Sequence, residues 1–245
     1  MRQGDYTILE NSRIASRIWR MTLGGDTEGM LRGGQFADVE VDGCFLRRPF
    51  AVTDWTKDTL SLIYKVVGQG TEKMTGWKEG RNVNLLTGLG NGFDTSLCRE
   101  KALVVCGGIG ASPTFHLVKE LIAQGKEVMV VLGYNNASEL ILFDEYRKLG
   151  AGVRVATMDG SVGIKGLVTD VIDTLDGGYD FFYTCGPKVM MEAVCRKLDI
   201  SGQVSLEERM GCGCGICFGC TCHTTDGPRR VCFDGPVFKK EEVIW

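Results

Sequence analysis

Residues 102–113 read Ala102-Leu103-Val104-Val105-Cys106-Gly107-Gly108-Ile109-Gly110-Ala111-Ser112-Pro113. The first five are a short apolar run, which is typical of a buried parallel strand. A helical pattern follows the glycines, with Ser112 as the predicted N-cap and Pro113 as the first helical residue. A glycine-rich turn between a strand and a helix lets phosphates approach the helix N-terminus. The predicted nucleotide-binding residues are Gly107, Gly108, Gly110, Ala111 and Ser112.

Strands and helices continue to alternate after this turn. Apolar runs at 127–132, 153–158 and 179–184 predict three more strands. Asn136 predicts the start of a helix that ends near Leu149, and the apolar spacing from Val168 to Leu175 predicts another. Such repetition is typical of a doubly wound parallel sheet, which binds ligands at the carboxyl ends of its strands.

The loop after the second of these strands indicates the type of nucleotide. It reads Gly133-Tyr134-Asn135-Asn136 and holds no arginine or lysine. A 2′-phosphate needs a cationic partner. The sequence therefore predicts NAD rather than NADP.

The chain before residue 99 has a different pattern. Short strands are predicted at 18–23, 36–41 and 60–67, with glycine-rich or aspartate-rich turns between them. This pattern favours an antiparallel barrel or sandwich. Arg48-Pro49 lies inside it, and proline on a strand is typical of an edge or a bulge. An arginine there can bind phosphate, and Gly70-Thr71 after the third strand can begin a short helix near the same ligand.

The end of the chain is rich in cysteine. Residues 209–222 read Arg209-Met210-Gly211-Cys212-Gly213-Cys214-Gly215-Ile216-Cys217-Phe218-Gly219-Cys220-Thr221-Cys222, and Cys232 follows. Cys212, Cys217 and Cys220 have the spacing C-x4-C-x2-C. With a fourth cysteine further on, this is the plant-type [2Fe–2S] pattern. It predicts Cys212, Cys217, Cys220 and Cys232 as metal ligands, and Cys214 and Cys222 as non-ligands.

Three other interpretations compete for these cysteines. A structural zinc site usually shows two separate C-x2-C pairs, and here only Cys217 and Cys220 form one. Disulfides need an oxidising compartment, and no signal peptide is visible. The third interpretation is a set of ordinary reduced, buried cysteines. Six cysteines in the last 34 residues, with glycines between them, argue against it.

Composition limits the compartment and the partners. The 245 residues carry a net charge of −3 and no basic block, so nucleic acid is a poor partner. No apolar run reaches the roughly 18–20 residues that span a bilayer. Eleven cysteines without an export signal indicate a reducing cytoplasm. Neither His116 nor His223 is assigned a role.

Several of these motifs resemble the ferredoxin–NADP reductase superfamily. The resemblance rests on Arg48-Pro49-Phe50-Ala51, on Gly70-Thr71 and on a strand that ends in Cys185-Gly186-Pro187. It implies an FAD held by the barrel, with Ile63, Tyr64 and Lys65 along the flavin and Gly70 and Thr71 at its pyrophosphate. Cys185, Gly186 and Pro187 then lie beside the nicotinamide. Ala51 replaces the hydroxyl residue of the family signature, which leaves the hydrogen bond to the flavin N5 open; a backbone N–H could substitute.

Taken over its whole length, the chain resembles the electron-transfer subunit of the NAD-dependent (class 1B) dihydroorotate dehydrogenases. Glu208-Arg209-Met210-Gly211-Cys212 and the closing Cys232-Phe233-Asp234-Gly235-Pro236-Val237-Phe238 carry this resemblance. It implies FAD, one [2Fe–2S] cluster and a partner subunit with FMN that oxidises dihydroorotate to orotate in pyrimidine biosynthesis. It also implies a heterotetramer of two plus two subunits.

The expected fold is therefore multidomain, β plus α/β. We expect an FAD-binding β-barrel at 1–98, a doubly wound parallel α/β NAD domain at 99–203 and a small [2Fe–2S] domain at 204–245. Electrons are expected to pass from the partner FMN to the cluster, then to FAD and to NAD⁺. The protein positions and tunes these centres, so no catalytic proton-transfer residue is assigned.

Two other functions stay open at this point. One is a related NAD(P)H–ferredoxin-type reductase subunit that has the same cofactors and another partner. The other is a non-enzymatic redox-sensing or zinc-stabilised binding module, for which NADH oxidation with artificial acceptors would be negligible.

Overall fold

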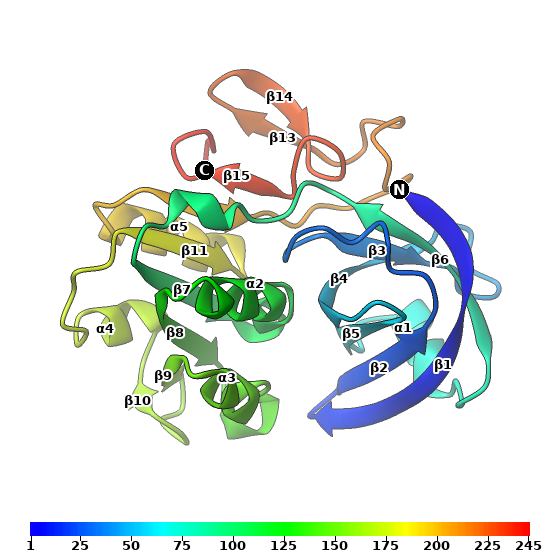
Figure 1. The fold of residues 1–245 in the computed structure, drawn as a ribbon, viewed down its shortest axis with the longest axis horizontal. Helices are drawn as coiled ribbons and strands as arrows, with labels where there is room; N and C mark the ends of the chain where they lie inside the picture. Colours follow the sequence, from blue (N-terminus) through cyan, green and yellow to red (C-terminus); the bar gives the residue numbers. More distant parts are fainter.

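The computed structural model describes the whole chain, residues 1–245. Its first part is a closed antiparallel barrel with the strand order β1-β2-β5-β4-β3-β6 (Figure 1). The strands are β1 (Arg2–Ala15), β2 (Ile18–Gly24), β3 (Phe36–Val39), β4 (Arg48–Trp55), β5 (Thr59–Lys65) and β6 (Asn82–Leu89), and α1 (Gln69–Thr75) follows β5. The antiparallel barrel expected from the sequence is confirmed.

A seven-stranded sheet forms the second part, in the order β10-β9-β8-β7-β11-β12-β15. Its strands are β7 (Lys101–Gly107), β8 (Glu127–Tyr134), β9 (Gly152–Thr157), β10 (Ile164–Lys165), β11 (Phe181–Cys185), β12 (Gly202–Ser205) and β15 (Val237–Lys239). All neighbours are parallel except β12 and β15. The strand that ends the cysteine-rich segment therefore completes the edge of the nucleotide-binding sheet.

Helices cover both faces of this sheet, as a doubly wound fold requires. Leu117 of α2 (Ala111–Ala123) and Tyr146 of α3 (Phe143–Leu149) share one core with Val104 of β7. Val171 of α4 (Val168–Ile172) and Val194 of α5 (Lys188–Lys197) share another core on the opposite face. None of the helices is both long and apolar enough to cross a membrane.

Helix α2 also joins the sheet to the barrel, and it lies between them in Figure 1. Barrel residues Ile18 and Ile63 belong to the same apolar core as Leu117. Gly33 lies so close to the helix that a Cβ on it would be 2.5 Å from the backbone nitrogen of Leu117. The barrel and the sheet thus meet through a well-packed, largely apolar contact.

The cysteine-rich segment crosses the top of both parts in Figure 1. It contains one hairpin, β13 (Thr221–Thr224) with β14 (Gly227–Arg230). Its apolar core includes Phe36 of β3, Leu89 of β6 and Val204 of β12. The segment therefore packs on the barrel and on the sheet together.

Two predicted helix starts are wrong. A 3₁₀ turn at Gly108–Gly110 precedes α2, so Gly110 rather than Ser112 is the N-cap, and the Ser112 hydroxyl bonds Thr53 instead. The helix expected from Asn136 to Leu149 is interrupted. Asn136 caps only the 3₁₀ turn Ala137–Glu139, because Ile141 and Leu142 turn into the core before α3 begins.

Candidate functional site

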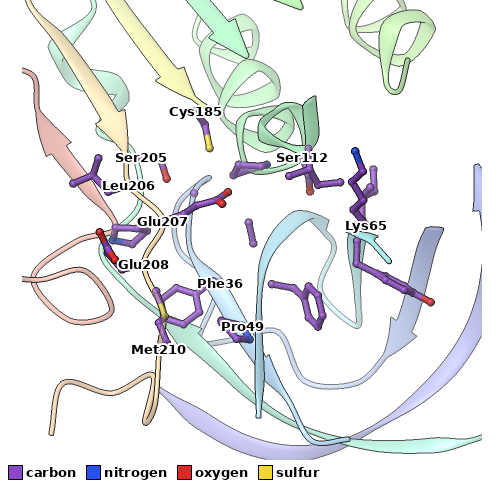
Figure 2. Close-up of a pocket in the computed structure, with 18 of the residues that line it drawn as sticks. Phe36, Pro49, Lys65, Ser112, Cys185, Ser205, Leu206, Glu207, Glu208 and Met210 are labelled. Carbon is purple, nitrogen blue, oxygen red and sulfur yellow. The ribbon is translucent and has the colours of Figure 1, made fainter. Parts of the chain in front are cut away.

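The first of two adjoining cavities opens between the barrel, the N-terminal end of α2 and the segment after β12 (Figure 2). The predicted flavin residues that line it are Pro49, Phe50, Ala51, Ile63, Tyr64 and Lys65. Ser112 and Cys185, predicted for the nucleotide, line it from the sheet side. Residues from three distant parts of the sequence thus face one hollow.

The second cavity lies at the carboxyl ends of the parallel strands. Its volume of about 600 Å³ lies within the usual range for small-molecule sites, about 300–1,000 Å³. The predicted residues that line it are Lys65, Gly107, Gly108, Gly186 and Pro187. Tyr134 and Asn135 line it from the end of β8. This is the place where a doubly wound sheet binds its ligand.

Five of the predicted flavin and nucleotide residues line neither cavity: Arg48, Gly70, Thr71, Gly110 and Ala111. Arg48 and Gly70 lie together, since a Cβ on Gly70 would be 2.8 Å from Nε of Arg48. Thr71 occupies the third position of α1 rather than its cap, and its hydroxyl accepts the N–H groups of Val67 and Gly68. Arg48, Gly70 and Thr71 therefore form a separate group beside the first cavity.

Gly110 has a structural reason to be glycine. A Cβ there would lie 2.2 Å from the carbonyl oxygen of Cys185. The turn after β7 and the end of β11 can approach each other only without that side chain. The glycine thus brings the two strand ends together at the rim of both cavities.

Lys65 and Glu139 form an ion pair across the mouth of the cavities. Nζ of Lys65 on the barrel lies 2.8 Å from Oε1 of Glu139, and Asn135 donates to the other oxygen of Glu139 at 2.9 Å. The Lys65 hydrogen bond is the main cause that holds the pKa of Glu139 below its ordinary value. The nucleotide cavity therefore has an ordered carboxylate at the end of β8.

Glu207 is a candidate that the sequence did not indicate. It lines both cavities, and Figure 2 shows its side chain reaching into the first. Its side chain is exposed, but the protein atoms that crowd around the cavity displace solvent and raise the pKa of its carboxyl group. Only its place after β12, opposite the end of β11, gives it this position, and no local motif marks it.

The four predicted ligand cysteines gather in two pairs. The backbone N–H of Cys217 lies 3.4 Å from Sγ of Cys212, and the N–H of Cys232 lies 3.3 Å from Sγ of Cys220. Three or more potential ligand side chains do not converge on one point. Two thiols for each of two irons is the arrangement that a binuclear cluster needs.

The loop around Cys212 favours a thiolate. Burial raises the pKa of this thiol, but backbone N–H groups from Cys217 and Cys214 outweigh it and lower the pKa to about 6. The second pair is more enclosed, and burial raises the pKa of Cys232 to about 12. Cys217 is exposed while Cys220 and Cys232 are buried. One pair therefore faces solvent and the other faces the protein.

The first cavity and the cysteines share an apolar core. Phe36 lines the cavity and also belongs to the core that contains Cys220 and Cys232. Met210, two residues before Cys212, lines the same cavity and packs against the same core. The cysteine-rich segment is therefore packed beside the first cavity.

Polar contacts fasten this segment in place. The side chain of Asn91 donates to the carbonyl of Val237 at 2.8 Å and accepts the N–H of Val237 at 3.1 Å. Arg230 bonds Asp234 and the carbonyl of Gly215, and its guanidinium lies over the ring of Phe233. The position of the cysteines relative to the first cavity is therefore fixed.

Comparison with known proteins agrees with this geometry. Residues 207–244 match the family described as the iron-sulfur cluster binding domain of dihydroorotate dehydrogenase B. Residues 104–196 match the oxidoreductase NAD-binding domain.

Two curated relatives match nearly the whole chain. The electron transfer subunits of dihydroorotate dehydrogenase B (NAD(+)) from Fusobacterium nucleatum and Bacillus pumilus are each 38% identical to it. The alignments cover 99% of this chain and 99% and 98% of those proteins.

Solved structures share the fold. An NADH-dependent reduced ferredoxin-NADP oxidoreductase superposes with a TM-score of 0.89 and 29% identity over 98% of this chain and 90% of that one. A ferredoxin NADP⁺ reductase from Neisseria gonorrhoeae superposes with a TM-score of 0.68 and 15% identity over 80% of this chain and 90% of that one.

Proposed function

This chain belongs to the family of electron transfer subunits of dihydroorotate dehydrogenase B, and we propose that it connects a dihydroorotate-oxidising partner to NAD⁺. Electrons enter through a [2Fe–2S] cluster, pass to FAD and leave on NAD⁺. The observation that carries this order is that Phe36 and Met210 line the first cavity and also pack in the apolar core that contains Cys220 and Cys232. The first cavity adjoins the second, at the nucleotide-binding strand ends, because Lys65, Ile109 and Glu207 line both.

The first cavity suits the FAD. On the barrel side its lining comes from β4 and β5, and about half of the whole lining is apolar, which suits a flat ring system. Arg48, Gly70 and Thr71 lie together beside it and are our candidates for the diphosphate. Ala51 carries no hydroxyl, but Ser112, Ser205 and Glu207 are among the polar side chains that line the cavity.

The second cavity suits NAD. Gly107 and Gly108 both line it, and Gly108 has open space around it that leaves room for phosphates. Gly186 and Pro187 are our candidates beside the nicotinamide. Glu139 and Asn135 offer oxygen and amide groups to a ribose, whereas a 2′-phosphate would meet the carboxylate of Glu139. We therefore retain NAD as the acceptor.

The cysteines suit the cluster because their donor atoms are thiols arranged two by two. Cys212 with Cys217, and Cys220 with Cys232, are the proposed ligand pairs. When bound, FAD exchanges a hydride with NAD and single electrons with the cluster, and for this reason it must lie between them. The chain holds the three sites at fixed places, with proposed units at 1–98, 99–203 and 204–245.

The test of the proposed order removes one ligand. Cys217→Ser should abolish dihydroorotate-driven NAD⁺ reduction in the complex with the partner, while NADH oxidation by a dye through FAD keeps at least half of its rate. Cys214→Ser, a thiol of the same loop outside the ligand set, is the matched control. Equal loss of both activities in a folded Cys217→Ser protein would contradict the order.

The partner is a finer proposal. The family name, electron transfer subunit, implies a catalytic partner, and we propose that this partner contains FMN. We also propose a heterotetramer of two plus two subunits and a cytoplasmic location. Co-purification with the tagged chain should yield an FMN protein that oxidises dihydroorotate.

The structural likeness to a ferredoxin-NADP oxidoreductase favours a second candidate function, a reductase subunit with another partner. Co-purification of a protein without dihydroorotate activity would support this second candidate. Negligible NADH oxidation would instead support a redox-sensing module.

A further inference from the structure

Asp38 is a buried acid without an assigned role. It lies on β3 and is 3% exposed, and its Oδ1 has no hydrogen-bond partner. A buried polar atom without a partner is costly, so native proteins rarely keep one without a use. The burial of this carboxylate with an unpaired oxygen therefore needs a physical explanation, which its surroundings provide.

The strand directs Asp38 away from the barrel core. Ala37 and Val39 belong to the core inside the barrel, while Phe36 belongs to the core around Cys220 and Cys232. Because side chains alternate along a strand, Asp38 shares the outward face of Phe36. This face is the one on which the cysteine-rich segment packs.

The carboxylate meets the first cysteine loop directly. A Cβ on Gly213 would lie 1.9 Å from Oδ2 of Asp38, and Gly213 has a φ of +66°. Glycine is thus required next to Cys212 both by its backbone conformation and by the carboxylate. Burial raises the pKa of Asp38 to about 6, Arg47 opposes this rise, and Cys212 adds to it, as expected for groups close to each other.

No cation neutralises the carboxylate by direct contact. Arg47 bonds the carbonyl of Asp38 at 3.5 Å, but its guanidinium pairs with Glu40 at 2.9 Å. The oxygens of Asp38 therefore face the loop of Cys212 rather than a salt-bridge partner. The negative charge of the Asp38 carboxylate therefore acts mainly on a group bound by the loop of Cys212.

We propose that Asp38 positions the loop of Cys212 and Cys217 and lowers the reduction potential of the cluster that the loop holds. This inference rests on the proposed function, since it takes the cysteines to be cluster ligands. Reduction adds one electron to an already negative cluster and breaks no bond. A nearby carboxylate opposes that added charge, and net charge and hydrogen bonding are the factors that set such potentials. A lower potential makes the reduced cluster a stronger donor toward FAD and NAD⁺.

The test compares Asp38→Asn with Glu79→Gln, an exposed carboxylate between α1 and β6. The cluster potential is measured by EPR-monitored redox titration at about pH 8, above the raised pKa of Asp38 of about 6. At the wild-type midpoint, Asp38→Asn should raise the ratio of reduced to oxidised cluster about tenfold, which is 59 mV for a one-electron couple. Glu79→Gln should change the ratio by less than about twofold, and the FAD potential should stay constant.

An unchanged or lowered cluster potential in Asp38→Asn would overturn the proposal. The half-life of the cluster under a chelator gives a second readout, and it should shorten in Asp38→Asn but not in Glu79→Gln. Asp38→Ser, which is smaller, replaces the asparagine variant if that one does not fold. Wild-type protein without iron and sulfide would overturn the proposed function itself, which distinguishes the two failures.

Discussion

At the scale of single residues, the side chains that meet in the cavities come from distant parts of the chain. The cysteine-rich segment and the glycine turns could be identified as sites, because each chemistry requires a residue type at a fixed spacing. Glu207 and Asp38 could not, since nothing in the neighbouring sequence marks an isolated acid. Their positions depend on which strand ends and strand faces the fold brings together.

Glu207 provides a test at this scale. As a hydride leaves NADH, positive charge develops on the nicotinamide, and a nearby carboxylate stabilises it. Glu207→Gln should slow flavin reduction by NADH about tenfold, or about 1.4 kcal/mol, and leave FAD content unchanged. Rapid-mixing absorbance at the flavin band measures the rate.

The pH dependence of that rate follows from the same residue. The protein atoms that displace solvent around Glu207 raise its pKa above the ordinary value, so the carboxylate form is lost at a higher pH than for a fully solvated glutamate. The wild-type rate should fall as the pH drops through this raised pKa, and the rate of Glu207→Gln should not. Parallel pH profiles for the two proteins would contradict the assignment.

At the scale of elements, the order of strands and helices was predictable, but helix ends were not. The predicted cap Ser112 lies two residues inside the start of α2, because Gly108–Gly110 form a 3₁₀ turn that the close contact with Cys185 requires. The helix expected after Asn136 is interrupted because Ile141 and Leu142 are needed in the core. In both places, tertiary packing overrides the local capping signal.

The close contact between Gly110 and Cys185 leads to a prediction about the 3₁₀ turn Gly108–Gly110. Gly110→Ala places a methyl group against the carbonyl of Cys185, and relieving this clash requires a shift of the backbone, which costs free energy. We expect a loss of about 1–3 kcal/mol in the free energy of unfolding and a weaker affinity for NADH. Urea unfolding and NADH titration measure both. Gly125→Ala, at a turn with open space around it, should leave NADH affinity unchanged even if it lowers stability.

At the scale of the whole molecule, a polar cluster links the barrel to α2. The ring of His116 stacks on Trp55 with 3.4 Å between centroids, and its Nδ1 lies 2.6 Å from Asp54. Lys119 lies 3.0 Å from the same carboxylate. The sequence alone gave no partner for His116, because both partners belong to a strand some sixty residues away.

The carboxylate of Asp54 should stabilise the contact between the barrel and α2 at neutral pH. Burial raises its pKa, but the hydrogen bonds from His116 and Lys119 outweigh burial and lower it. A lowered pKa contributes stability above the unfolded pKa, near 3.9, and this contribution is lost as the pH falls through the folded pKa. Asp54→Asn should therefore cost about 1 kcal/mol at pH 7 and much less near pH 3. Urea midpoints at both pH values measure this, with exposed Asp199→Asn as control.

The central claim is that FAD lies between NAD and the cluster, and one rapid-mixing experiment tests it most directly. Anaerobic oxidised protein is mixed with NADH, and the flavin and cluster absorbances are followed together. We expect the flavin band to bleach before the cluster band, and protein depleted of FAD to leave its cluster oxidised. Reduction of the cluster by NADH in the FAD-depleted protein would contradict the account.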